Sequence, residues 1–131
     1  MIADVLSATT NKSLNTAAWV LQILMGALFL FAGASKLFGA PDMVSFFAEA
    51  GFGQWLRYAL GAIEVGSSIA LFMPRSAFYG AVVLSISLVG HIVIHALVLH
   101  RPAGFLFLLI SVTLLIAFLR RSRSNARSSS V

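Results

Sequence analysis

The fold of this chain is decided by residues 17–38, which read AAWVLQILMGALFLFAGASKLF. The stretch carries no charge before Lys36, and only Gln22 and Ser35 interrupt it with polar side chains. A helix that crosses the hydrocarbon core of a bilayer needs about 20 mostly apolar residues. The sequence therefore predicts a transmembrane helix over residues 17–38.

A cleaved signal peptide is the alternative for the same stretch, since Ala32-Gly33-Ala34 resembles a small-residue cleavage site. The apolar run is longer than the roughly 7 to 15 residues of a signal-peptide core, which favours the membrane helix. Residues 1–16 are polar and show no helical periodicity. We expect them to form a loose polar leader.

The composition extends the membrane interpretation to the whole chain. Of its 131 residues, 60% are hydrophobic and 10% are charged, whereas a soluble domain has about 25% charged residues. The net charge of +5 does not indicate nucleic-acid binding, because the basic residues lie at the edges of apolar runs or near the C-terminus. The chain has no cysteine, which excludes disulfides, thiolate metal sites and CxxC redox chemistry.

Three further apolar segments follow, and short turns containing Pro74 and Pro102 separate them. They are predicted as transmembrane helices over residues 54–73, 76–99 and 103–119. The second span is the weakest, because it contains Arg57 and Glu64. The predicted fold class is all-α, an integral membrane bundle of four transmembrane helices in a domain covering residues 17–119.

Residues 41–50 are too short and too polar to span a membrane. Pro41 suits a first helical turn, Asp42 favours a helix N-terminus and Gly51 suits a helix end. We expect a short interfacial helix between the first two spans, with an ordered loop as the alternative. Residues 120–131 form a basic Ser/Arg-rich tail that we expect to be disordered.

The basic residues also predict the orientation of the bundle. Four spans place both termini on one side, together with the turn at residues 74–75. That side would carry Lys12, Arg75, Arg120, Arg121, Arg123 and Arg127, against Lys36, Arg57 and Arg101 on the other. The positive-inside rule then predicts that both termini are cytoplasmic.

Four ionisable residues lie inside or beside the predicted spans: Lys36, Glu64, His91 and His95. A charge near the bilayer centre costs at least about 2.5 to 3.5 kcal/mol on insertion scales, so it usually has a partner or a task. If Arg57 marks the membrane interface, counting along the helices places Glu64 and His91 about 10 Å below the outer surface. All four residues are therefore expected to converge in the outer half of the membrane as a polar or ligand-binding site.

Other interpretations of these residues are open. Lys36 can reach the interface by itself, and Glu64 can form a structural ion pair with Lys36 or accept a hydrogen bond from a histidine. His91, His95 and Glu64 could instead bind a divalent metal, although the spacing of the two histidines is weak evidence alone. The glycines Gly26, Gly33 and Gly61 are expected at close helix contacts.

Three segments of the chain resemble the DoxX family of small membrane proteins. They are GALFLFAGASKLFG at residues 26–39, FAEAGF at 47–52 and GAIEVG at 61–66. The resemblance covers roughly residues 17–119 and implies a bacterial inner-membrane protein with four helices. It also implies that Lys36 and Glu64 are family-typical polar positions. Some relatives are membrane subunits of thiosulfate:quinone oxidoreductase, whose thiosulfate chemistry this cysteine-free chain gives no reason to assume.

The function that these observations favour is small-molecule binding within a membrane redox system, as a subunit or accessory protein. A quinone is the candidate ligand, because a histidine and a carboxylate can exchange hydrogen bonds and protons with its oxygens. The alternative is a structural or assembly partner of another membrane protein or of itself as an oligomer. A proton-coupled transporter is less favoured, and an enzyme with self-contained catalytic machinery is not evident.

Overall fold

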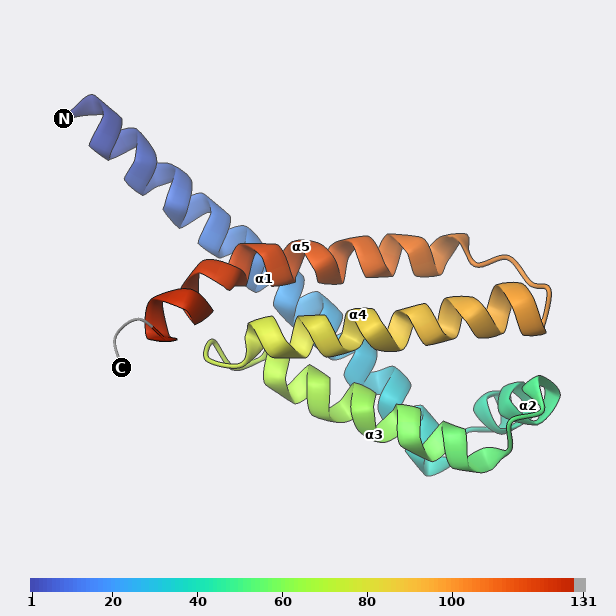
Figure 1. The fold of residues 1–131 in the computed structure, drawn as a ribbon. Helices are drawn as coiled ribbons and strands as arrows, with labels where there is room; N and C mark the ends of the chain where they lie inside the picture. Colours follow the sequence, from blue (N-terminus) through green and yellow to red (C-terminus); the bar gives the residue numbers. More distant parts are fainter. Residues whose placement is uncertain (129–131) are drawn as a thin grey trace.

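The computed structural model describes residues 1–128, with side chains described up to Arg121, and this part of the chain is helical throughout apart from short turns (Figure 1). Its elements are α1 (Ile2–Phe38), α2 (Pro41–Ala50), α3 (Gln54–Leu71), α4 (Ala77–Val93), a π-helical turn η1 (Ile94–Val98) and α5 (Gly104–Ser128). The predicted all-α fold and the short helix between the first two long helices are confirmed.

The four long helices pack into one bundle. Helix α3 packs against both α1 and α4, and α5 packs mainly against α4 with a smaller contact to α1. Figure 1 shows α4 and α5 lying side by side, with α1 crossing behind them. Both termini lie at one end of the bundle, and α2 lies at the opposite end.

Three helical segments within the described residues are long and apolar enough to cross a membrane. They are α1, residues 77–98 of α4 and η1, and residues 104–121 of α5. Helix α3 has 18 residues and is less apolar, because its buried side carries Arg57, Glu64 and two serines. Its neighbours α1 and α4 cover these polar groups, while its other side is exposed at Trp55, Tyr58 and Ile69. The long apolar helices make the chain a multi-pass membrane protein.

The start of α1 and the end of α5 differ from the sequence-based expectations. Helix α1 begins at Ile2 and not near residue 17, and within its first half the hydroxyls of Ser7, Thr9, Thr10 and Thr16 donate to carbonyl oxygens three or four residues earlier. Its 37 residues span about 55 Å, well beyond a hydrocarbon core of about 30 Å, and its first half projects from the bundle (Figure 1). Helix α5 continues to Ser128, through residues expected to be disordered. The remainder of that tail, 129–131, lies outside the described residues.

The short helix α2 is defined by residues at its ends. Gly39 ends α1 in the left-handed conformation with φ of 74°, and Pro41 then occupies the first position of α2. Gly51 ends α2 with φ of 80°. These caps turn the chain twice within about a dozen residues, so α2 lies across the end of the bundle (Figure 1).

Glycines allow the closest helix contacts. A Cβ atom on Gly33 of α1 would lie 2.9 Å from the carbonyl oxygen of Gly61 in α3, and one on Gly61 would lie 3.0 Å from that of Gly33. A Cβ on Gly80 would lie 2.8 Å from the Ser67 carbonyl oxygen, and one on Gly26 would lie 2.7 Å from the Phe72 ring. Both faces of α3 therefore depend on residues without a side chain.

We predict that Gly61→Ala destabilises the bundle, because the new methyl group meets backbone atoms that cannot move independently. The expected loss is about 1 to 3 kcal/mol, as for other overpacked interiors. Gly66→Ala is the matched control on the same helix, since a Cβ at that position would meet nothing within 4 Å. Alanine favours a helix over glycine by about 1 kcal/mol, so the control should melt at or above the wild-type temperature. Equal melting temperatures for both variants in detergent would contradict the prediction.

Candidate functional site

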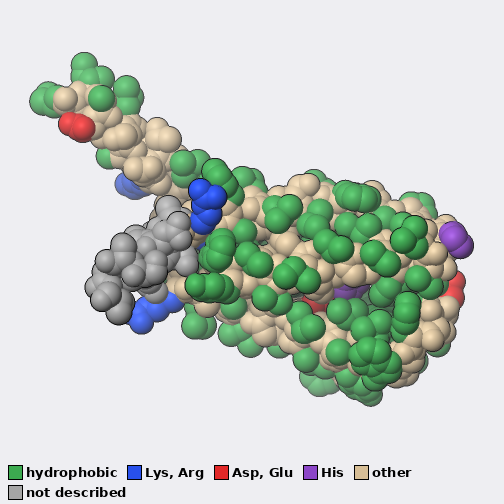
Figure 2. Space-filling view, in the orientation of Figure 1, with side chains coloured by type: hydrophobic (Ala, Val, Ile, Leu, Met, Phe, Trp, Pro, Cys, Tyr) green, Lys and Arg blue, Asp and Glu red, His purple; other side chains and the backbone are tan. Residues whose placement is uncertain are grey.

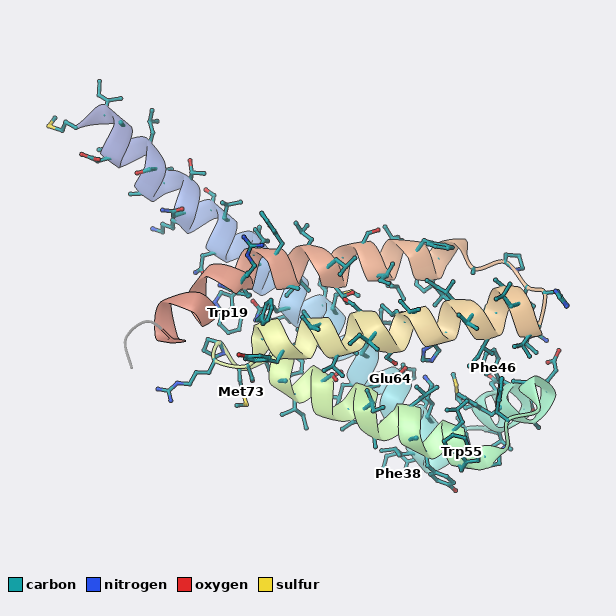
Figure 3. All side chains as sticks on the ribbon, in the orientation of Figure 1. Trp19, Phe38, Phe46, Trp55, Glu64 and Met73 are labelled. Carbon is teal, nitrogen blue, oxygen red and sulfur yellow. The ribbon has the colours of Figure 1, made fainter. Side chains whose placement is uncertain are left out.

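A buried carboxylate with two basic partners forms the centre of the candidate site. The Glu64 Oε2 atom accepts a hydrogen bond from the Lys36 Nζ atom at 2.8 Å, and Oε1 lies 3.2 Å from the His91 Nε2 atom. Glu64 is 1% exposed, Lys36 5% and His91 8%, which places all three inside the bundle. Figure 3 shows Glu64 between α3 and α4, within the packed helices.

The two close-contact glycines determine this pairing. A Cβ on Gly61 would lie 3.0 Å from the Lys36 Cβ atom, and one on Gly33 would lie 3.0 Å from the Glu64 Cβ atom. Each charged residue therefore faces a glycine of the opposite helix. This reciprocal arrangement brings α1 and α3 close enough for the lysine to reach the carboxylate without leaving the interior.

His91 is oriented by its own helix. Its Nδ1 atom lies 2.9 Å from the Ser87 carbonyl oxygen, which can only accept, so Nδ1 carries a proton. The Nε2 atom then faces Glu64 within ion-pair distance but without hydrogen-bond geometry. The Ser87 hydroxyl is also buried without a partner among the described residues. Two polar atoms on one side of α4 thus retain hydrogen-bonding capacity.

Arg57 connects the site to α2 and has a role that the sequence did not indicate. Its guanidinium Nη1 donates to the Lys36 carbonyl oxygen, and its Nε donates to the Gln54 side chain at 2.6 Å. Gln54 in turn donates to the Val44 carbonyl oxygen at 3.1 Å. The sequence suggested that Arg57 marks the membrane interface; the structure shows that its side chain is covered by protein, at 4% exposure, and that it caps the end of α1.

His95 is separate from the carboxylate cluster. It belongs to η1 and makes no contact with Glu64 among the ion pairs of the cluster, but it lines the larger cavity together with Lys36 and His91. Its ring centroid lies 5.0 Å from that of Phe46 in α2. Within residues 1–121 no three histidine or acidic side chains are grouped to hold a metal ion, so the described geometry does not support the metal interpretation.

Two cavities meet at the cluster. The larger, of about 460 Å³, is lined mainly by polar residues where α2 faces η1, and its wall includes Asp42, Glu49, His95 and Arg101. The smaller, of about 250 Å³, has apolar walls except where Lys36, Glu64 and His91 close one side. In Figure 2, acidic and histidine atoms are visible between the hydrophobic side chains of this face. The site is therefore buried in protein yet adjacent to open volume.

An ion pair lies at the rim of the larger cavity and connects two segments of the chain there. The Arg101 Nη2 atom lies 2.8 and 2.6 Å from the two carboxylate oxygens of Glu49. This pair joins α2 to the turn between η1 and α5, and both side chains are about half exposed. Together with the contact of Phe46 on His95, it holds α2 over the end of the bundle.

A second polar network lies at the opposite end and was missed in the sequence. Gln22 is fully buried, and its amide donates to the Leu71 carbonyl oxygen at 2.8 Å. Arg120 donates to the Gln22 side-chain oxygen at 2.5 Å and to Asn15 at 2.8 Å. The only sequence signal was the interruption of an apolar run by Gln22. This network ties α1, α3 and α5 together near the termini.

The chain is similar to known proteins over most of its length. The family model described as the DoxX-like family matches residues 20–118. A protein of Bacillus subtilis (strain 168), "Putative oxidoreductase CatD", is 26% identical over 83 residues, which are 63% of this chain and 62% of that protein. The chain thus spans less than two thirds of that relative's length. No solved structure matches the chain significantly.

We predict that Lys36→Met destabilises the protein by about 3 to 5 kcal/mol, because Glu64 then remains buried without its main partner. The double variant Lys36→Met/Glu64→Gln should recover part of that loss, since it removes the uncompensated charge. Arg101→Gln is the control: it breaks a half-exposed pair worth about 0 to 1 kcal/mol. Thermal unfolding in detergent measures all three. A double variant less stable than Lys36→Met would contradict the prediction.

Proposed function

This chain belongs to the DoxX-like family, and we propose that it is a membrane-embedded, quinone-binding subunit or accessory protein of a redox system. The observation that carries the proposal is the buried Lys36–Glu64–His91 cluster, of which Lys36 and His91 line both cavities and Glu64 lines the smaller one. A charged cluster of this kind within a membrane bundle usually serves a ligand or a proton path.

The chemistry of the cluster suits a quinone head group. The ring oxygens of a quinone accept hydrogen bonds, and those of a quinol also donate them. Lys36 supplies donors and Glu64 supplies acceptors. The His91 Nε2 atom, whose partner Nδ1 faces the Ser87 carbonyl oxygen, accepts a hydrogen bond when the ring is neutral and donates one when it is protonated, so both redox forms find partners. The larger cavity, at about 460 Å³, falls within the usual range of small-molecule sites, about 300 to 1,000 Å³.

Reduction of a quinone to a quinol needs two electrons and two protons. In this proposal the electrons come from a partner redox protein, and the chain itself binds the ring and passes protons. His91 and Glu64 are suited to that passage because their side chains face each other at 3.2 Å. The name of the Bacillus subtilis relative supports a redox setting for the family.

A structural role in assembly is the second candidate. It is favoured by the direct Lys36–Glu64 hydrogen bond, which partly satisfies the cluster without a ligand. In that case the cluster would only fix the register of α1 and α3, and a defined membrane complex would copurify with His91→Leu as well as with the wild type.

Binding of a short-tailed benzoquinone to the protein in lipid nanodiscs tests the proposal by calorimetry. We expect His91→Leu and Glu64→Gln to weaken binding by tenfold or more, since a hydrogen bond to a charged group contributes about 1.5 to 3 kcal/mol. His100→Leu and Asp4→Asn are matched controls, because both residues are exposed and lie outside the cavity walls. Unchanged binding in both site variants, or no binding to the wild type, would refute the proposal.

We also propose that both termini are cytoplasmic, in a bacterial inner membrane. Figure 2 supports this, since the basic side chains of the visible face gather at the end that carries the termini. The absence of cysteine allows single-cysteine labelling with a membrane-impermeant maleimide. In spheroplasts, His100→Cys should react at once and Asn11→Cys only after permeabilisation. The reverse pattern would invert the orientation.

A further inference from the structure

We infer that the ligand is an amphiphile with one hydrophobic tail and a compact uncharged head, and that its tail lies between α1 and α5. The inference rests on the proposed head-group site and adds the class of ligand and its route. The juxtaposition that carries it is an apolar cavity that ends on the Lys36–Glu64–His91 cluster.

The two cavities lie next to each other, because Lys36, Met43 and His91 line both of them. A molecule with its head on the cluster therefore has the larger cavity, with its charged rim, on one side and the almost wholly apolar cavity on the other. Met43 of α2 stands at the junction, where an unbranched thioether side chain can adapt to a ligand.

The apolar cavity leads toward lipid. Its walls come from one stretch of α1, with Leu28, Phe29 and Ala32, and from the start of α5, with Phe105, Leu106 and Leu109. Leu28 is 40% exposed and Phe105 66% exposed, so the opening lies on the outer surface of the bundle. In a membrane-spanning bundle this surface faces hydrocarbon.

The charged residues that line the two cavities indicate which kind of head group fits. The linings of the two cavities contain three carboxyl groups, on Asp42, Glu49 and Glu64, against one lysine and one arginine, Lys36 and Arg101. Glu64 and Glu49 already occupy those cations as ion-pair partners. A phosphate would meet an excess of negative charge, so an uncharged ring with hydrogen-bonding oxygens fits better than a phospholipid head.

The hydrocarbon tail affects where the ligand lies more than how tightly it binds. A hydrocarbon tail that moves from lipid to an apolar cavity exchanges one apolar environment for another, so the hydrophobic driving force is small. A comparison of binding constants would therefore test the inference poorly. The location of the tail is the quantity to measure, and a cysteine-free chain allows single thiols to report it.

The experiment uses the full chain in nanodiscs with Ala32→Cys, which is in the cavity wall, and Phe31→Cys, whose native side chain is 75% exposed on the same helix. Leu106→Cys and Leu108→Cys form a second pair on α5. Each thiol reacts with a lipid-soluble maleimide. The probes are two fully substituted benzoquinones that differ only in a decyl chain against a methyl group, so that neither has a free ring position for the thiol.

We expect the decyl probe to slow modification of Ala32→Cys and Leu106→Cys about tenfold at ten times its Kd, where the site is free about a tenth of the time. Phe31→Cys and Leu108→Cys should react at unchanged rates, and the methyl probe should protect none of the four. If the decyl probe binds by calorimetry but protects neither cavity thiol, this inference fails while the head-group proposal stands.

Two other outcomes also decide the matter. If neither probe binds, the proposed function itself fails. If the cavity thiols react slowly without any probe, and quickly after the phospholipid is exchanged for detergent, a lipid chain is the resident occupant and the inference is overturned. Because the two cavity positions lie on different helices, misfolding of one variant, detected by size-exclusion chromatography, leaves the other to give the result.

Discussion

The structure depends on one electrostatic requirement. A carboxylate buried inside a membrane bundle needs a basic or hydrogen-bonding partner within contact distance. Glu64 meets this requirement only because α1 and α3 touch at Gly33 and Gly61, each opposite a charged residue of the other helix. A side chain at either glycine would meet backbone atoms of the other helix and force the two helices apart at the point where the lysine and the carboxylate pair. The backbone contact at the two glycines and the ion pair between Lys36 and Glu64 therefore depend on each other at this interface.

The two ends of the bundle are held by different chemistry. At the α2 end, Arg57 and the Glu49–Arg101 pair connect α2 to the helices around the open cavities. At the end that carries the termini, Gln22 and Arg120 connect α1, α3 and α5 by hydrogen bonds. Hydrophobic packing of residues such as Leu71, Leu84 and Ile116 fills the interior around these networks. The α2 end combines its polar contacts with two cavities that could hold a ligand.

Much of the fold followed from local patterns. Long apolar runs separated by proline-containing turns predicted the helices, and the rare ionisable residues inside them pointed to Lys36, Glu64 and His91. The sequence could not predict the Gln22–Arg120 contact, because the two residues are 98 positions apart and nothing local pairs them. It also could not predict the bond from Arg57 to the Lys36 carbonyl oxygen, because the two residues are 21 positions apart and lie on different helices. The helical N-terminal segment was missed because its polar residues lack the apolar periodicity on which such a prediction relies.

The π-helical turn η1 has a consequence for how such a bundle can change during evolution. An α-helix advances by about 100° per residue, so the loss or gain of one residue in this turn would swing His95 around the helix axis. The flanking helices could keep their contacts, because the turn lies between α4 and the loop that leads to α5. A change of length in η1 would thus change the orientation of the side chains at the rim of the larger cavity, and the ion pair between Lys36 and Glu64 would stay as it is.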